Sequence, residues 1–338
     1  METGTSAALD RVAAADGGPH RFLRAAWFAA AAGDAPMTTL IARKAGVDIA
    51  AIPVVERRHG PLSLREVPGS YWPYRSFPLA ECVGEAELAA FLGSSEARHA
   101  LGRAWRLGPV YADDPTAVRL AAVARASGWT LLSRRLGTCY VVDLAALAAN
   151  GPWPSSKTLR KNRWLERRLA ESGELTFSTV TGPNWDSTVF ETLAAIEAES
   201  WVARKADARD TKFLHAASRA VWARVVGDPI LAEQLAASIL HVGGVPAAFT
   251  FRLRSGDTVY YIANSFSERF REGSPGRILL YRDFQQAVAD GIAIIGWGAG
   301  DPGYKSEMGA RPGPDIVDLL VVRGPLAALA RPLWRSRG

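Results

Sequence analysis

The sequence predicts an α/β protein made of two units, and three observations support this. The chain has 338 residues, a length typical of about two domains. Segments with the two-residue alternation of strands are interspersed with segments of helical periodicity. A stretch rich in proline and glycine at residues 150–156 (NGPWPSS) marks the expected junction. We therefore expect a disordered tail at residues 1–19, a first unit at 20–150 and a second unit at 151–330.

The first unit reads as a mixture of helices and strands. A helix ends at Gly33, a common C-terminal stop, and two short strands turn near Gly46 in a hairpin. Further elements are expected, in order, as a helix at 85–104, a strand at 104–110, a helix at 114–128 and a strand pair at 129–144. None of these segments carries a recognisable chemical motif.

The second unit has a more regular order of elements. A helix at 155–173 begins at a serine cap and ends at Gly173. Gly243-Gly244 and Ser255-Gly256 mark hairpin turns between three successive strands. The remaining elements are expected as a strand at 174–180, helices at 184–201 and 211–227, strands at 234–242, 245–253 and 258–266, a helix at 277–290, and strands at 292–297 and 314–324.

Composition is that of a globular protein with a basic surface. Apolar residues make up 48% of the chain and charged residues 22%, so either unit can bury its own core. The net charge is +6 and the isoelectric point is about 9.5. This charge favours acidic partners such as phosphates, nucleotides or a membrane surface, although a solvated basic surface explains it equally well.

Cysteine usage and the amino terminus favour a reducing cytoplasm. Cys82 and Cys139 lie far apart and form no Cys-x-x-Cys pair, so we expect neither a zinc site nor a disulfide framework. The five histidines show no metal-ligand spacing. The chain starts without a basic leader, and the alanine-rich run at 25–33 is too short to span a bilayer. The sequence therefore predicts a cytoplasmic protein with no transmembrane segment and no metal.

Positive charge is concentrated in the first helix of the second unit. Leu165 and Leu169 give this helix one apolar face, whereas its other positions are mostly basic. The basic residues are Lys157, Arg160, Lys161, Arg163, Arg167 and Arg168. Runs of charge are usually solvated surface, and the functional alternative is contact with phosphate or an acidic substrate.

A strand-to-helix corner, SFSERFREGSPGRILL at residues 265–280, carries the most chemistry. Pro275 and Gly276 open the helix, and a helix start presents unpaired N–H groups and the positive end of the helix dipole. Such a terminus can bind an anion, and Gly276 allows the backbone to approach a ligand closely. The alternative is that Pro275 only starts a helix, a position that proline favours.

The corner and its place in the order of elements resemble the GNAT acyltransferase superfamily. The superfamily pattern is Arg or Gln, two residues, Gly, one residue, then Gly or Ala before an aliphatic helix. Residues 271–276 (REGSPG) are similar to it and depart at Ser274, where glycine is common. The resemblance implies two tandem GNAT-like units, each a twisted, mostly antiparallel sheet flanked by helices.

Three stretches resemble one subgroup, the BioF2-like or CelD-type acetyltransferases associated with polysaccharide and cellulose biosynthesis. They are SSKTLRKNRWLERRLAESG, EAESW with Lys205 following, and SPGRILL with a downstream YK. The likeness covers residues 155–322 and extends to Fem-type aminoacyltransferases, which carry two GNAT-like halves. The first half is only loosely similar to the degenerate amino-terminal repeat of this family.

The resemblance implies acetyl-CoA, or another acyl-CoA, as co-substrate. The expected pyrophosphate contacts are Arg271, Ser274, Pro275, Gly276, Arg277 and Ile278, and the expected pantetheine contacts are Asn264, Ser265 and Phe266. Arg269 and Arg282 are further cations within reach of phosphates, although any single arginine is more often a solvent-facing charge. Phe266 also fits plain core packing.

The resemblance also places the catalytic groups. Tyr304 corresponds to a tyrosine that protonates the departing thiolate, although here the next glycine lies five residues on rather than four. A buried structural tyrosine is the alternative. Asp301, Glu199, Asp210 and Glu307 are the candidates for the general base, and the sequence does not choose between them. Trp201, Lys205, Asp210 and Lys305 are expected near the acceptor.

Three functions are compatible with these features. The first is direct acyl transfer from CoA to an amine or hydroxyl of a sugar, polysaccharide precursor or other small molecule, because no nucleophilic cysteine or serine motif is present. The second is a Fem-like transferase that uses aminoacyl-tRNA, for which the basic helix would contact the backbone. The third is a catalytically silent binding module. DNA is not an expected partner.

Overall fold

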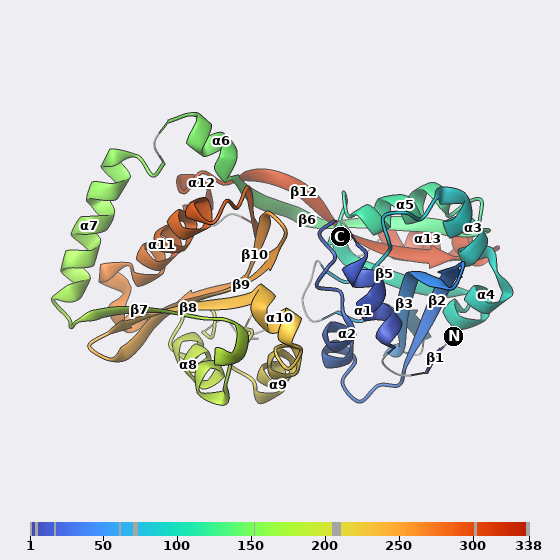
Figure 1. The fold of residues 1–338 in the computed structure, drawn as a ribbon, viewed down its shortest axis with the longest axis horizontal. Coiled ribbons are helices and arrows are strands. Elements are labelled where there is room, and N and C mark those ends of the chain that lie inside the picture. The colour runs from blue at the N-terminus through green and yellow to red at the C-terminus, as the bar shows by residue number, and fades with distance from the viewer. Residues whose placement is uncertain are drawn as a thin grey trace. The chain divides into compact units, whose positions relative to one another are not determined.

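The chain folds into two compact units, each a sheet flanked by helices (Figure 1). The computed structural model describes residues 2–3, 6–16, 18–60, 62–69, 74–151, 153–204, 211–300 and 303–335. Unit 1 contains Met1–Cys139 and Pro312–Gly338, and unit 2 contains Tyr140–Arg311. Strands β6 (Thr130–Asp143) and β12 (Arg311–Val322) carry the chain into unit 2 and back. The predicted α/β fold class is confirmed.

Unit 1 is built on a mostly antiparallel sheet in the order β1-β2-β3-β4-β5-β12-β6. Strands β4 and β5 pair in parallel, whereas β1–β2, β2–β3, β3–β4 and β5–β12 pair antiparallel. Ala45 and Gly46 both have positive φ in the β2–β3 turn, as predicted for a tight hairpin. The strands are β1 (Glu2–Thr3), β2 (Met37–Lys44), β3 (Val47–His59), β4 (Leu62–Glu66) and β5 (Ala104–Tyr111).

The helices of unit 1 include one where the sequence analysis placed a disordered tail. Helix α1 (Ala7–Ala14) is capped by Ser6, and Leu9 and Val12 are fully buried in it. Because alanines surround Leu9 and Val12, the helical spacing of these two residues does not stand out in the sequence. The other helices are α2 (Ala25–Ala32), α3 (Glu85–Gly93), α4 (Ser95–Leu101), α5 (Pro115–Val123) and α13 (Leu326–Arg335).

Unit 2 is built on a sheet in the order β11-β10-β9-β8-β7. Both predicted hairpins form, with glycines of positive φ at 243, 244 and 256. The pair β10–β11 is parallel, and the others are antiparallel. The strands are β7 (Leu175–Val180), β8 (Leu235–Val242), β9 (Val245–Ser255), β10 (Thr258–Phe266) and β11 (Ile294–Ala299).

Helices cover both faces of the unit 2 sheet (Figure 1). Helices α7 (Ser156–Ala170) and α11 (Pro275–Ala289) lie on one side, where Leu165, Leu240 and Ile278 share a core cluster. On the other side the rings of Phe213 and Trp222 contact Phe251 of β9. That side holds α8 (Ser187–Ala198), α9 (Ala216–Val225) and α10 (Pro229–Gln234). No helix in the described ranges is long and apolar enough to span a bilayer.

Several elements differ from the sequence expectations. The pair of strands expected at 129–144 is the single strand β6. The helix expected at 85–104 is two helices, because Ser94 ends α3 and caps α4 through its side chain. Helices α10, α13 and α6 (Leu144–Ala149) were not expected. Helix α6 has six residues and follows β6 directly, so its apolar residues read as a continuation of that strand.

A buried carboxylate fixes α11 to the sheet. Asp283 accepts hydrogen bonds through Oδ2 from the hydroxyl of Thr250, from Arg252 Nη1 at 3.1 Å and from the Tyr261 hydroxyl at 3.5 Å. Burial, and then the adjacent carboxylate of Asp283, raises the pKa of Tyr261 well above its ordinary value. The tyrosine therefore stays neutral and donates to the carboxylate, which places the middle of α11 over β9 and β10.

Asp283→Ala should destabilise the protein by about 3 to 5 kcal/mol, because it leaves the guanidinium of Arg252 without its buried counterion. Asp290→Ala, which removes only an exposed contact with Gln286, should cost about 0.5 kcal/mol or less. Urea unfolding monitored by circular dichroism measures both. Equal losses in the two variants would show that the buried network does not anchor the helix.

Candidate functional site

The strand-to-helix corner lies in unit 2, between β10 and α11. Strand β10 ends at Phe266, a 3-10 helix η2 (Glu268–Gly273) follows, and α11 starts at Pro275. Ser274 has φ 51° and ψ 51°, the left-handed conformation. Glycine adopts this conformation without the steric cost that a side chain brings, which explains why the superfamily pattern has glycine there.

The start of α11 leaves the backbone N–H of Gly276 as the first-turn donor for an anion, because Pro275 has no N–H and the N–H of Arg277 donates to the carbonyl oxygen of Ser274. The Ser274 side chain makes no capping hydrogen bond, whereas a serine cap normally occupies one of these donors. The backbone carbonyl of Ser274 accepts from the N–H groups of Arg277 and Ile278. The helix is 15 residues long, so a full dipole is present at this end.

Packing behind the corner explains its glycines. A Cβ on Gly276 would lie 3.2 Å from the ring of Phe266, and one on Gly273 would lie 2.6 Å from Leu169. Pro275 and Ile278 are buried, so only their backbone can reach a ligand. Phe266 can therefore pack in the core while the loop faces a ligand. The side chains of Phe266, Pro275 and Ile278 pack inward, and the backbone of the loop remains to contact the ligand.

The arginines around the corner are held by neighbouring acids and rings. Arg277 Nη1 lies 3.1 Å from Glu307 Oε2, and its Nε lies 3.5 Å from Asn162 Oδ1. Arg271 pairs with Glu268 at 3.4 Å and remains exposed. Arg282 pairs with Glu166 at 2.9 Å. Arg277 is thus placed at the first turn, whereas Arg282 is directed to α7.

Strands β10 and β11 stop pairing midway, next to this corner. Their parallel pairing ends at Tyr260↔Gly296 in the described residues, while β10 continues beside β9 as far as Phe266. A register shift between Tyr261 and Ala263 bends β10 at that point. Asn264, Ser265 and Phe266, the expected pantetheine contacts, therefore belong to a strand segment whose other edge β11 does not occupy.

Two buried side-chain donors flank this opening without a partner. The hydroxyl of Ser265 on β10 and the indole N–H of Trp297 on β11 are both buried and lack a hydrogen-bond partner in the structure. Buried polar groups are normally satisfied, and leaving one unpaired costs about 1 to 3 kcal/mol.

Helix α12 (Tyr304–Glu307) returns to the end of β11. Lys305 is buried, and its Nζ donates to the carbonyl oxygens of Trp297 at 2.6 Å, Ala299 at 3.3 Å and Gly298 at 3.4 Å. The Tyr304 ring packs edge-on against Trp297, 5.4 Å between centroids. The structure thus places Tyr304 beside the opening and uses Lys305 to hold the end of β11.

The α8 end of unit 2 forms an open hollow of about 640 Å³. It is lined by Ala198, Glu199, Arg204, Glu268 and Arg269. Glu199 accepts a hydrogen bond from the hydroxyl of Ser267, directly after β10, and Trp201 is 46% exposed nearby in sequence.

Some expected site residues fall outside the described residues: Lys205, Asp210 and Asp301. The pairing of Glu199 with Ser267 was not foreseen, because nothing in the sequence connects residues so far apart. In the described part of the chain, no group of three or more His, Cys, Asp or Glu residues could hold a metal ion.

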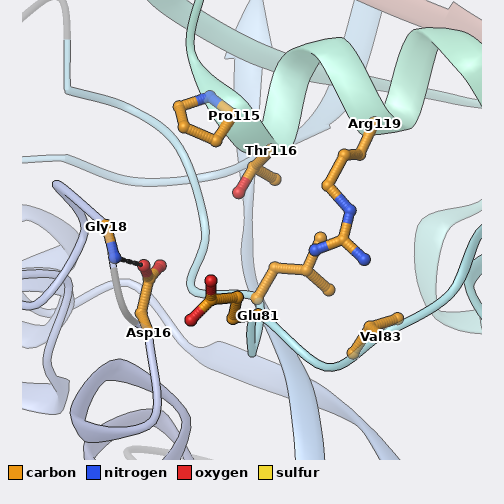
Figure 2. Close-up of a pocket in the computed structure, with 8 residues that line it drawn as sticks. Asp16, Gly18, Glu81, Val83, Pro115, Thr116 and Arg119 are labelled. Atoms are coloured by element: carbon orange, nitrogen blue, oxygen red, sulfur yellow. Dashed lines mark hydrogen bonds between the residues drawn. The ribbon is translucent and has the colours of Figure 1, made fainter.

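Unit 1 has a cavity of its own, of about 520 Å³. Figure 2 shows the carboxyl groups of Asp16 and Glu81 on one side, Arg119 reaching down from α5, and Thr116 above them. Burial raises the pKa of Asp16. Asp16 Oδ1 accepts from the N–H of Gly18 at 2.7 Å, which closes the turn after α1.

A buried histidine lies behind this cavity. His20 Nε2 is 2.7 Å from Asp114 Oδ2, and its Nδ1 is 3.3 Å from the hydroxyl of Thr116. That hydroxyl donates to the carbonyl of Phe77, so it accepts from His20 and both ring nitrogens carry protons. Burial opposes this charge, but Asp114 and then Asp16 outweigh it, and the pKa of His20 is raised.

The fold and order of elements in unit 2 are those of a GNAT-type acyltransferase domain. Residues 156–306, from α7 to α12, match the family profile described as "Acetyltransferase (GNAT) domain". No curated protein sequence matches the chain.

Solved structures with a similar fold have low sequence identity. FemX is 12% identical over 98% of this chain and 100% of that chain, with a TM-score of 0.64. The C-terminal domain of a putative lysylphosphatidylglycerol synthetase from Agrobacterium fabrum is 15% identical over 96% and 94%, with a TM-score of 0.56. L-PGS from Bacillus licheniformis is 13% identical over 99% and 97%, with a TM-score of 0.54. These likenesses show a shared fold.

The pH dependence of stability should report the buried histidine. Because the pKa of His20 is raised above its ordinary value of 6.5, its contribution is complete below pH 6.5 and is lost as the pH rises through the folded-state pKa. Burial acts against the charge of Asp114, but His20 outweighs it and lowers its pKa, so that contribution is lost in acid.

Urea unfolding of the wild type and His20→Gln across a pH series tests this. The stability difference between them should be largest in mildly acidic solution and should shrink as the pH rises above neutrality. A difference that does not vary with pH would mean that His20 is neutral in the folded protein.

Proposed function

We propose that the protein transfers an acyl group, acetyl in the simplest case, from acyl-CoA to an amine or hydroxyl of a sugar, polysaccharide precursor or other small acceptor. The observation that carries the proposal is the divergence of β10 from β11 beside the uncapped start of α11. Pyrophosphate would bind the first turn of α11, with Arg277 beside it, and the pantetheine arm would lie along Asn264–Phe266.

The chemistry that this arrangement supports is direct transfer. The acceptor nitrogen or oxygen attacks the thioester carbonyl, a C–N or C–O bond forms, and the C–S bond breaks. The acceptor loses a proton to a carboxylate, for which Asp301 and Glu199 are the candidates. The departing thiolate takes a proton from the hydroxyl of Tyr304, which α12 holds beside the end of β11. We also propose that the protein belongs to the BioF2-like or CelD-type subgroup.

An aminoacyl-tRNA donor is the second candidate, and the surface of α7 favours it. The exposed face of this helix carries cations at successive turns around Trp164, which is 49% exposed. The guanidinium of Arg168 lies 5.6 Å from the Trp164 ring centroid. Cations interleaved with an aromatic ring suit a nucleic-acid backbone and its bases. The exposed cations are Lys157, Arg160, Lys161, Arg163, Arg167 and Arg168.

Mass spectrometry of ligands retained on the purified protein separates the donors, because CoA and tRNA differ greatly in mass. Binding of tRNA that weakens steeply with salt, together with no binding of acetyl-CoA, would favour the second candidate.

Gly276→Glu should weaken acetyl-CoA binding at least about tenfold, which corresponds to about 1.4 kcal/mol. The new carboxylate stands at the first turn of α11, where it repels a pyrophosphate and displaces Phe266. Val288→Glu adds the same charge near the far end of α11 at a position that is 40% exposed, and it should bind normally. Isothermal calorimetry on both folded variants measures this. Equal affinity in the two would refute the pyrophosphate site.

Tyr304→Phe should lower turnover by roughly 100- to 10,000-fold, the usual contribution of general acid help. Its affinity for acetyl-CoA should change little, because the ring still packs on Trp297. Tyr140→Phe is the matched control, since Tyr140 is half-buried against the same core cluster. A thiol-release assay follows a screen of amino sugars and peptide amines. Wild-type turnover in Tyr304→Phe would assign the proton to another donor.

A further inference from the structure

The outer face of α13 in unit 1 is apolar and exposed. Leu329 is 68% exposed and Leu333 is 71% exposed, the two highest values among the large apolar side chains of the described residues. They are four residues apart, so they lie on one face of the helix. Single exposed leucines are ordinary on protein surfaces, but an adjacent pair this exposed marks a surface available for contact.

The inner face of α13 is fixed, so the helix cannot turn these leucines inward. Leu326, Ala327, Ala330 and Trp334 pack against a cluster formed by Leu132, Leu320 and Val322. The indole N–H of Trp334 donates to the carbonyl oxygen of Asp318 at 3.3 Å. The guanidinium of Arg134 lies 4.2 Å from the centre of the same ring. Rolling the helix would break these contacts, and the outward leucines therefore need an external partner to be buried.

The charged residues of this segment are all positive. The sequence after Asp318 contains four arginines and no acidic residue. Arg323 belongs to the interior side, because its guanidinium lies 5.0 Å from the Trp129 ring. Arg331 is exposed two residues from each leucine, so it lies on the opposite side of the helix from them. Arg335 and Arg337 follow in the sequence. Leucines with arginines and no acids are typical of a helix that lies in an anionic lipid interface.

We propose that α13 docks on the surface of a bilayer that contains anionic lipid. Leu329 and Leu333 enter the boundary between headgroups and acyl chains, and Arg331, on the opposite and polar side of the helix, stays at the level of the lipid phosphates. A second copy of the chain is the less favourable occupant, because two exposed leucines bury much less surface than a stable protein interface needs. This surface is independent of the acyl-transfer site proposed in unit 2.

The test is co-sedimentation of the full chain with vesicles of phosphatidylcholine alone and of phosphatidylcholine mixed with phosphatidylglycerol. The wild type should bind the anionic vesicles at least about tenfold more tightly than the neutral ones. Leu329→Ser/Leu333→Ser should lose that binding by about tenfold or more. The matched control, Ile230→Ser/Val288→Ser, removes two exposed apolar side chains from unit 2 and should bind as the wild type does.

Binding of the wild type should also weaken as ionic strength rises from about 0.1 M to about 1 M, because salt screens the arginines. Sedimentation that survives in Leu329→Ser/Leu333→Ser would overturn the proposal and assign the binding to another basic surface such as α7. No sedimentation of the wild type would also overturn it. A dimer in sedimentation velocity that the leucine variant abolishes, without vesicle binding, would assign the face to a second copy.

Discussion

The geometry of the candidate site depends on the buried carboxylate of Asp283. Helix α11 must present its first turn beside β10, and apolar packing alone leaves a helix free to rotate or slide by small amounts. Directional hydrogen bonds from Thr250, Arg252 and Tyr261 remove that freedom, because they come from two adjacent strands and meet at one carboxylate. The price is a desolvated ion pair, which stabilises little in itself but specifies one arrangement.

A second set of polar contacts holds the end of β11 and helix α12 beside the start of α11. Lys305 donates hydrogen bonds to three carbonyl oxygens at the end of β11. These acceptors therefore stay paired where the strand leaves β10. Glu307, one turn away on α12, pairs with Arg277 at the start of α11. Tyr304 is therefore held between the strand end and the helix start by its neighbours in sequence, and its position does not rest on its own packing alone.

Much of unit 2 could be predicted from the sequence, because its elements have clear periodicity and are separated by glycine turns. The start of α11 was recognisable because Pro275 and Gly276 are uncommon together inside regular elements. The ties that complete the site were not recognisable. Lys305 was expected to face an acceptor, and the structure shows it donating to β11. A buried lysine among backbone carbonyls has no sequence signature, since its partners are peptide groups that every residue carries.

The sequence was less informative about unit 1. Alanine-rich helices such as α1 show little difference in hydrophobicity between their buried and exposed faces. Strand β6 was interpreted as two strands because its buried and exposed residues do not alternate regularly. The return of β12 to unit 1 after Arg311 is a long-range pairing, with Val317 beside Val110. Pairings of this kind depend on the tertiary fold and leave no local trace.

The split of unit 1 between Met1–Cys139 and Pro312–Gly338 has a consequence for synthesis on the ribosome. Strand β5 is complete early, yet the partner that hydrogen-bonds its edge, β12, follows the whole of unit 2 in the sequence. During translation of the whole of unit 2, β5 carries an open edge and the apolar residues Trp105, Leu107 and Val110, all fully buried in the finished protein. Open edges of this kind recruit other strands. The nascent chain therefore has a long interval before β12 emerges, in which protection by a chaperone decides between folding and aggregation.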